Sequence, residues 1–356
     1  MLGSFIGLLA LCKIVIDCVK VGPSKVFSQQ KRNKPPACLE DSSLGTHGYA
    51  HLEVRNFVSR IKASFVITQD IRMHYVSNGS EDKPLMLLVH GFPEFWYSWR
   101  YQLKEFKDRY RVVAVDLRGY NETDKPSGIS SYKTAKLATD LKQLITALGY
   151  SDCVLVGHDW GGAVCWAFAE KFPDLVNHLI ILNCPNIKAF RKHVRSSLKQ
   201  VKMSWYMYFF QLPFLPELMF KLQDYAILDQ LFRSKHSGVR SDRMSDEDIE
   251  AYKYTFSRKS CSGLTGPINF YRAAFEVERR PPDQSGSRSK GISVPTLVLW
   301  GTEDAALDNR LAEMSCEVCT GKVVLRYIEG ASHWVQMDRP DLVNKYMREF
   351  LTESEK

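Results

Sequence analysis

An aspartate, Asp159, stands where an apolar, β-branched run meets a small-residue segment, in the sequence Val154-Leu-Val-Gly-His-Asp-Trp-Gly-Gly. Gly157 and Gly161 flank it, as glycines flank the apex of a strand–turn–helix elbow that exposes a nucleophile above a sheet. A carboxylate is already a nucleophile at neutral pH and suits displacement at saturated carbon. Asp159 could therefore open an epoxide or displace a halide and form an ester, although a single aspartate after a strand is as often a helix cap.

Two further residues could complete a catalytic set, and both follow apolar segments that are typical of buried strands. Asp304 follows residues 296–301, and His333 follows residues 323–328. The chain order of nucleophile, acid and histidine is that of an α/β-hydrolase. We expect His333 to activate the water that hydrolyses the ester on Asp159, and Asp304 to orient His333.

A fourth element precedes all three, because residues 85–94 form an apolar run that ends in the tight loop His-Gly-Phe-Pro-Glu. The backbone N–H groups of Phe92 and Trp160 could form an oxyanion hole for the tetrahedral intermediate of ester hydrolysis. Alternatively, the loop is an ordinary turn after a strand. We interpret His90 as structural, because a second histidine has no task in this chemistry.

From about residue 35 to its end, the chain resembles the epoxide hydrolases of the α/β-hydrolase superfamily, and most closely the membrane-anchored group of epoxide hydrolases 3 and 4. The His-Gly-x-Pro loop and the Asp-Trp elbow carry the family likeness. The resemblance implies an α/β-hydrolase fold, which is a mostly parallel eight-stranded sheet flanked by helices, with an inserted helical cap. The long stretch through Leu103 is nearer to a subfamily mark. The residues that carry the likeness as a whole are 36–39, 43–47, 90–103, 115–120 and 157–161.

The resemblance also implies two tyrosines on the cap that hold the epoxide oxygen and protonate it as the ring opens. Tyr271, in Gly266-Pro-Ile-Asn-Phe-Tyr-Arg, matches the second of them. Tyr206 matches the first, because it precedes the pair Phe210-Gln211 at the family spacing; Tyr208 is the alternative, and an aromatic core helix would look similar. Phenols suit the task, because with a pKa near 10 they donate a proton without being ionised at rest.

One turn departs from the family pattern, because Asn121 stands where relatives usually have glycine. Asparagine tolerates left-handed backbone angles better than most residues, so we expect the turn to survive. The change creates an Asn-x-Thr sequon, and Asn78-Gly-Ser is another.

Composition agrees with a single large α/β unit rather than several independent domains. The chain has 356 residues, 45% hydrophobic and 25% charged, with a net charge of +8. The basic residues are scattered without a nucleic-acid motif, so no nucleic-acid partner is expected, and the charge weakly favours an anionic membrane surface. The expected organisation is an anchor at 1–22, a linker and lead-in at 23–60, core at 61–185, a helical cap at 186–290 and core at 291–356.

Neither a metal nor a cofactor is expected. Nine cysteines are present, and Cys153, Cys165 and Cys184 lie in apolar segments where they would pack as reduced, small hydrophobic side chains. Cys316 and Cys319 form a lone Cys-x-x-Cys without a second pair at metal spacing.

The N-terminal segment is apolar enough to suggest a retained membrane anchor. Residues 2–21 could just cross a hydrocarbon core, and their two inner charges, Lys13 and Asp17, could pair on one helical face. A cleaved signal peptide is the alternative, but a basic leader is missing. The basic residues that follow place the catalytic part in the cytosol by the positive-inside tendency, and we expect a single-pass protein of the endoplasmic reticulum membrane.

The spacing of apolar residues and the length of the apolar runs predict strands separated by helices, such as one at 133–148. The region assigned to the cap is predicted to be mostly helical. An active site between core and cap would be an apolar cleft, which favours lipophilic epoxides with water as the second reactant. The resemblance and the anchor together suggest fatty-acid epoxides. The predicted strands are 64–68, 71–77, 85–90, 112–116, 153–157, 179–182, 296–300 and 323–328.

Two other classes stay open at this level. A haloalkane dehalogenase shares the elbow and the histidine, but it needs a second halide-binding N–H donor, often an asparagine at the place that Glu94 occupies here. A non-catalytic binding protein of the same fold would be expected to have lost members of the triad, and none is lost in this sequence.

Overall fold

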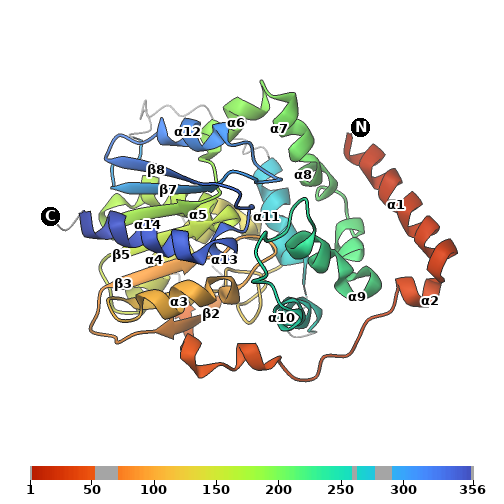
Figure 1. Ribbon diagram of the computed structural model, residues 1–356, viewed down its shortest axis with the longest axis horizontal. Helices are drawn as coiled ribbons and strands as arrows, with labels where there is room; N and C mark the ends of the chain where they lie inside the picture. The colour runs from red at the N-terminus through yellow and green to blue at the C-terminus, as the bar shows by residue number, and fades with distance from the viewer. Residues whose placement is uncertain (1, 53–70, 259–262, 277–290, 354–356) are drawn as a thin grey trace, which may run out of the picture.

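The computed structural model describes residues 2–52, 71–258, 263–276 and 291–353. Its centre is an eight-stranded sheet in the order β1-β2-β4-β3-β5-β6-β7-β8 (Figure 1). β1 pairs antiparallel with β2, and β2 pairs antiparallel with β4, whereas the other neighbours are parallel. The strands are Thr46–Leu52, Ile71–Asn78, Leu85–Val89, Arg111–Val115, Cys153–His158, Val176–Leu182, Thr296–Gly301 and Val323–Ile328, numbered β1 to β8 in that order.

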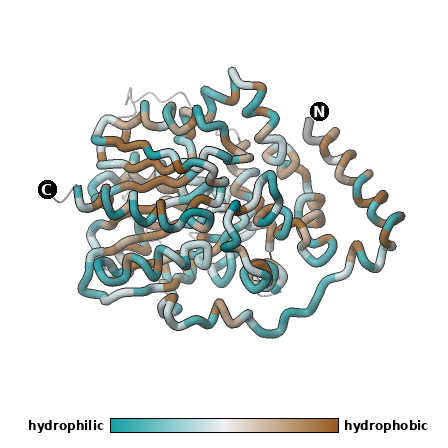
Figure 2. Tube along the Cα trace, in the orientation of Figure 1, coloured by the Kyte–Doolittle hydropathy of each residue, from teal (hydrophilic) through white to brown (hydrophobic). Residues whose placement is uncertain are grey.

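The central strands form because their sequences are apolar on both faces. Every residue of β3, β4, β5 and β7 is buried, as expected for parallel strands covered by helices on both sides. Figure 2 shows the hydrophobic segments gathered in this sheet. The flanking helices include α3 (Arg100–Phe106), which packs with α14 (Pro340–Glu353), and α4 (Thr134–Ala147), which packs with α5 (Asp159–Lys171). The predicted α/β-hydrolase fold is confirmed.

Helices alone occupy the described chain between β6 and β7. They form one side of the molecule, away from the C-terminus (Figure 1). Near the middle of α9, Gln223, Asp224 and Tyr225 adopt positive φ angles, so two helical pieces meet at a kink there. The helices are α6 (Ile187–Val194), α7 (Leu198–Met203), α8 (Trp205–Phe209), α9 (Leu215–Arg233), α10 (Asp246–Ser257) and α11 (Thr265–Phe275).

The first 52 residues differ most from expectation. Two helices, α1 (Leu2–Val21) and α2 (Pro23–Val26), lie against the helical side, and β1 forms within the stretch interpreted as a linker. β1 was not predicted because it is an edge strand whose sequence, Thr-His-Gly-Tyr-Ala-His-Leu, carries little apolar alternation. The strand predicted at 64–68 lies outside the described residues.

No helix in the described part of the chain is long and apolar enough to cross a membrane.

The turn at Asn121 forms as expected. Asn121 has φ +39°, and its side-chain amide donates to Asp116 Oδ2 at 2.7 Å. The hydrogen bond helps to hold asparagine in a left-handed conformation that glycine would adopt without a side chain.

Candidate active site

Asp159 sits on a tight turn between β5 and α5, with φ at +47°. A non-glycine residue in this region is strained and is held there by its surroundings. The turn closes because glycines allow close approach: a Cβ on Gly161 would overlap the Val89 carbonyl oxygen, and one on Gly157 would lie 2.7 Å from the Gly161 carbonyl oxygen. A Cβ on Gly91 would likewise overlap Asp159. The glycines therefore let the carboxylate stand against the β3 loop.

Backbone N–H groups help to hold the Asp159 carboxylate in place. The Phe92 N–H donates to Oδ1 at 2.8 Å, and the Trp160 backbone N–H also hydrogen-bonds to the carboxylate. Burial raises the pKa of Asp159, but His333, the charge of His158 and the Trp160 N–H lower it more, so the pKa lies below its ordinary value. Asp159 is therefore ionised at neutral pH and ready to act as a nucleophile.

His333 and Asp304 complete the line of groups that the sequence predicts. His333 Nε2 lies 3.5 Å from Asp159 Oδ2, and its Nδ1 lies 2.7 Å from Asp304 Oδ2. Burial lowers the pKa of His333, but the carboxylates of Asp304 and Asp159 raise it well above its ordinary value. Asp308, the other nearby acid in sequence, instead pairs with Lys199 and His193.

Asp304 is fixed by partners that sequence reasoning missed. Its Oδ1 accepts from the Ala306 and Leu307 N–H groups at 2.7 and 2.9 Å, and its Oδ2 accepts from Asn183 Nδ2 at 2.7 Å. Asn183 is fully buried and accepts from the Gly301 N–H with its own oxygen. This network holds the acid facing Nδ1 of the histidine.

His158 and Glu94 form a second acid–histidine pair next to His333, and the sequence did not predict this pair. His158 Nδ1 lies 2.7 Å from Glu94 Oε2, and His158 Nε2 lies 2.9 Å from the His333 carbonyl oxygen. Glu94 also accepts from the Gly91 N–H at 2.7 Å and from Gln336 Nε2 at 2.8 Å. The pair is fully buried and ties the turn at Asp159 to the backbone of His333.

His90 is placed as a structural residue. It is fully buried, accepts from the Leu117 N–H with Nε2 at 3.0 Å, and donates from Nδ1 to the Gly91 carbonyl at 2.8 Å. Both ring nitrogens are thus satisfied by the neutral form, and burial lowers the pKa of His90.

Tyr206 and Tyr271 line the same cavity as Asp159 and His333, which has a volume of about 690 Å³. Their rings lie 5.8 Å apart and nearly perpendicular. Burial raises the pKa of both phenols, and the Asp159 charge raises it further, so both stay protonated. Tyr208 does not line this cavity and packs against Phe275. Of the two alternatives in α8, Tyr206 is the one near the carboxylate.

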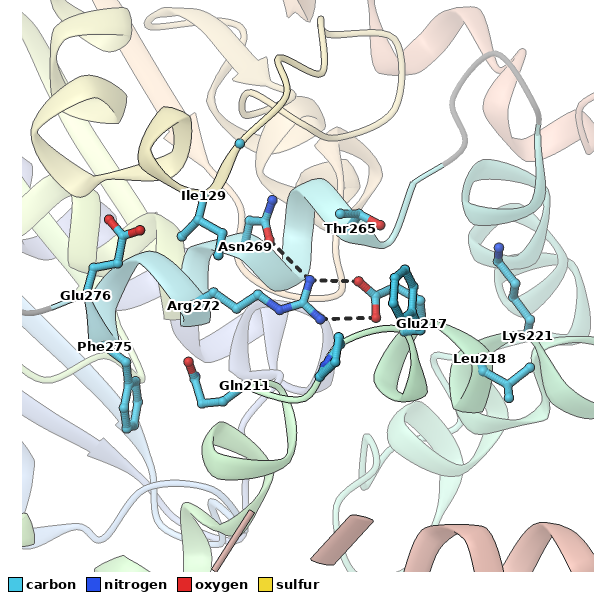
Figure 3. Close-up of a pocket in the computed structure, with 13 residues that line it drawn as sticks. Ile129, Gln211, Glu217, Leu218, Lys221, Thr265, Asn269, Arg272, Phe275 and Glu276 are labelled. Atoms are coloured by element: carbon cyan, nitrogen blue, oxygen red, sulfur yellow. Dashed lines mark hydrogen bonds and ion pairs between the residues drawn. The ribbon is translucent and has the colours of Figure 1, made fainter. Parts of the chain in front are cut away.

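A second cavity, of about 810 Å³, lies on the neighbouring side of α11, and Asp159, His333, Tyr206 and Tyr271 are not among its lining residues. Figure 3 shows its central side chain, Arg272, joined to Glu217 and Asn269. Arg272 also donates to the Phe210 and Leu212 carbonyls, at 3.0 and 2.7 Å. The Arg272 charge is therefore paired within the protein, and its hydrogen bonds hold the segment after α8 next to Tyr271.

Across the described ranges, no group of three or more His, Cys, Asp or Glu side chains is arranged to hold a metal ion. The cysteines there are free thiols, including Cys316 and Cys319.

The fold and the arrangement of Asp159, His333 and Asp304 define a hydrolase of the α/β-hydrolase class with a carboxylate at the nucleophile elbow. A family model described as the alpha/beta hydrolase fold matches residues 84–340. Over 334 residues the chain is 45% identical to epoxide hydrolase 4 from Homo sapiens, covering 93% of this chain and 86% of that protein. It is 41% identical to epoxide hydrolase 3 from Xenopus tropicalis over 351 residues, or 97% of this chain and 89% of that one.

Solved structures agree with this relationship. An epoxide hydrolase variant from Bacillus megaterium, solved with its naphthyloxy-propanediol product, is similar with a TM-score of 0.70 and 33% identity, over 79% of this chain and 97% of that one. Epoxide hydrolase A from Mycobacterium thermoresistibile has a TM-score of 0.66 at 27% identity, over 86% and 98%. The chain therefore belongs to the epoxide hydrolase family of α/β hydrolases.

Proposed function

We propose that the protein converts lipophilic epoxides to vicinal diols through a covalent ester on Asp159. The observation that carries this proposal is the arrangement around one cavity: a carboxylate with the Phe92 N–H on one oxygen and a histidine beside the other, together with two phenols. The names of the relatives support the same reaction. A non-catalytic protein of this fold would not be expected to retain a carboxylate, a histidine and two phenols around one cavity.

In the first step, Asp159 Oδ2 attacks an epoxide carbon while Oδ1 keeps its hydrogen bond from the Phe92 N–H. The C–O bond of the ring breaks, and its electron pair goes to the epoxide oxygen. Tyr206 and Tyr271 donate hydrogen bonds to that oxygen, and one of them supplies the proton that converts the alkoxide to a hydroxyl. The product is a hydroxyalkyl ester of Asp159.

In the second step, His333 removes a proton from water, and the resulting hydroxide attacks the ester carbonyl carbon. The negative charge develops on Oδ1, where the Phe92 N–H stabilises it, and the Trp160 N–H is the second donor that we propose for this oxyanion hole. Collapse of the intermediate breaks the bond between that carbon and Oδ2, and Oδ2 leaves as the second oxygen of the diol after taking the proton from the His333 imidazolium. The proton that remains on the new carboxyl group of Asp159 returns to the phenolate formed in the first step, so both phenols, neutral His333 and the Asp159 carboxylate are restored. Asp304 stabilises the imidazolium that forms at His333.

The tyrosine assignment has a matched control within one helix. We expect Tyr206→Phe and Tyr271→Phe each to slow ester formation by roughly 10- to 10³-fold, because one phenol partly replaces the other, and the double variant to be nearly inactive. Tyr208→Phe should be close to the parent. Single-turnover rates of epoxide consumption measure the step directly. Loss of rate in Tyr208→Phe but not in Tyr206→Phe would show that the wrong face of α8 was assigned.

The pKa shifts of Asp159 and His333 predict that a fall in pH affects ester formation and ester hydrolysis differently. Ester formation needs ionised Asp159, whose pKa is lowered. Ester hydrolysis needs neutral His333, whose pKa is still raised by Asp304 once the ester has removed the charge of Asp159. As the pH falls, hydrolysis should therefore slow before ester formation does, and the ester should accumulate. Acid quench and intact-protein mass at a series of pH values give the ester fraction. A fraction that falls steadily with decreasing pH would contradict this order.

Dehalogenation is the less favoured function. Glu94, at the place where a halide-binding donor would stand, is fully buried and bound to Gly91, His158 and Gln336. The indole N–H of Trp334 is bound to the Leu231 and Ser237 carbonyls. Turnover of a styrene-type epoxide alongside a haloalkane tests the choice: diol formation alone supports the proposal, and halide release alone or no turnover overturns it.

Fatty-acid epoxides are the substrate class that we propose, because the cavity is lined mainly by apolar and aromatic side chains. Contact with membrane lipid is proposed from the exposed apolar residues of α1, which include Phe5, Leu8, Val15 and Val19. Location at the endoplasmic reticulum with a cytosolic catalytic part remains a prediction from the sequence.

A further inference from the structure

Helix α1 forms part of the wall of the catalytic cavity. Ile6, Leu9, Ala10 and Lys13 line it together with Asp159 and the two tyrosines. The helix packs beside α8, as Figure 1 shows, and it approaches closely: a Cβ on Gly7 would lie 2.7 Å from Leu212 Cδ1. A segment more than one hundred residues from the elbow in sequence thus helps to shape the substrate site.

The position of α1 is fixed by the chain that follows it. Ile14 of α1 and Val26 of α2 are buried against Leu222 of α9. Further on, Arg32 forms a bidentate ion pair with Asp224, at 2.8 and 2.7 Å. The Asp224 N–H donates to the Ser28 carbonyl at 3.1 Å. These contacts hold α1 across the cap helices.

Lys13 is the charged residue that α1 brings to the cavity. Among the described residues that line it, the basic side chains besides His333 are Lys13 and the exposed His236, and the acid is Asp159. The Lys13 side chain is 58% exposed, so its ammonium group reaches solvent beside a cavity that is lined mainly by apolar side chains. Its partner is Asp17, with Nζ to Oδ2 at 2.6 Å.

Two features suit this ammonium group to an anionic ligand. An exposed pair four residues apart on a helix is weakly held, so Lys13 can exchange Asp17 for another carboxylate. A carboxylate at the cavity mouth stays partly hydrated and avoids the penalty of burial, while an attached alkyl chain is removed from water inside the cavity.

We propose that Lys13 binds the carboxylate of a fatty-acid epoxide whose chain enters the apolar cavity and presents its ring to Asp159. This inference rests on the proposed function and adds the subsite that selects the free acid over a neutral ester. Lys13 is a specificity residue, because it touches the substrate away from the reacting atoms.

The test compares the KM of a mid-chain epoxide of a long-chain fatty acid with that of its methyl ester, using the full chain. In Lys13→Gln, the KM of the free acid should rise about 3- to 5-fold, with kcat and the KM of the methyl ester unchanged. Asp17→Asn should change the KM of the free acid in the opposite direction, because it removes the competing carboxylate. Lys20→Gln, on the exposed surface of the same helix, is the matched control and should behave as the parent.

The Asp17 variant separates charge recognition from a structural effect. If the Lys13–Asp17 pair merely stabilises α1, both substitutions should change KM in the same direction for acid and ester alike, which would overturn the proposal. Equal KM values for acid and ester in the parent enzyme would overturn it as well. In either case, continued turnover of the methyl ester would leave the proposed epoxide hydrolysis intact, whereas no turnover of either compound would refute that function itself.

Discussion

Asp159→Asn is expected to lose epoxide turnover by on the order of 10⁴-fold or more, because an amide is a far poorer nucleophile than a carboxylate. The substitution is nearly isosteric, and both backbone donors at this position can still bind the amide oxygen. The loss should therefore appear in the chemical step while the fold is kept. Initial rates with a styrene-type epoxide, together with a thermal unfolding curve, measure the two effects separately.

Two controls make the Asp159→Asn result decisive. Mass analysis of the peptide must confirm asparagine, because slow hydrolysis of the amide would regenerate aspartate. Asp308→Asn is the second control, because Asp308 pairs with Lys199 at 3.2 Å and not with the catalytic histidine. This variant should retain activity. Undiminished turnover with asparagine confirmed at position 159 would refute the role of Asp159.

His333→Gln is expected to trap the ester. Ester formation needs no base, whereas attack of water on the ester does, so the variant should consume about one equivalent of epoxide and then stop. The intact mass of the protein should increase by the mass of the epoxide, and a peptide map should place the adduct on Asp159. The double variant Asp159→Asn/His333→Gln should carry no adduct. A His333→Gln protein that binds the epoxide but never forms the adduct would contradict the two-step order.

The site was predictable where a residue type is tied to a local backbone requirement. Gly157 and Gly161 mark the elbow because a Cβ at either position would overlap neighbouring backbone atoms. Asn121 could be placed in its turn because asparagine tolerates a positive φ angle. Asp304 and His333 could be placed because each follows an apolar strand, and parallel strands bring their ends to one edge of the sheet.

The supporting residues were not predictable in the same way. Asn183, Glu94 and His158 are polar side chains whose partners come from distant parts of the chain, and single-sequence patterns hold no record of such pairs. The choice between Tyr206 and Tyr208 needed the packing of α8, because residues two apart on a helix face nearly opposite directions.

Helix α1 shows a further limit of hydropathy. An apolar segment of this length suggests a membrane span, but hydropathy alone cannot distinguish lipid from a protein surface as the partner of its apolar side chains. The contact of Ile6 and Ala10 with the catalytic cavity became visible only once the cap was in place.

A single turnover in ¹⁸O-labelled water tests the ester on Asp159 most directly. With enzyme in excess over the epoxide, water attacks the carbonyl carbon of Asp159, so the label should enter the Asp159 carboxylate and the first diol should contain none. Diol that carries ¹⁸O in the first turnover, with an unlabelled Asp159 peptide, would mean that water attacks the epoxide directly and would contradict the covalent mechanism.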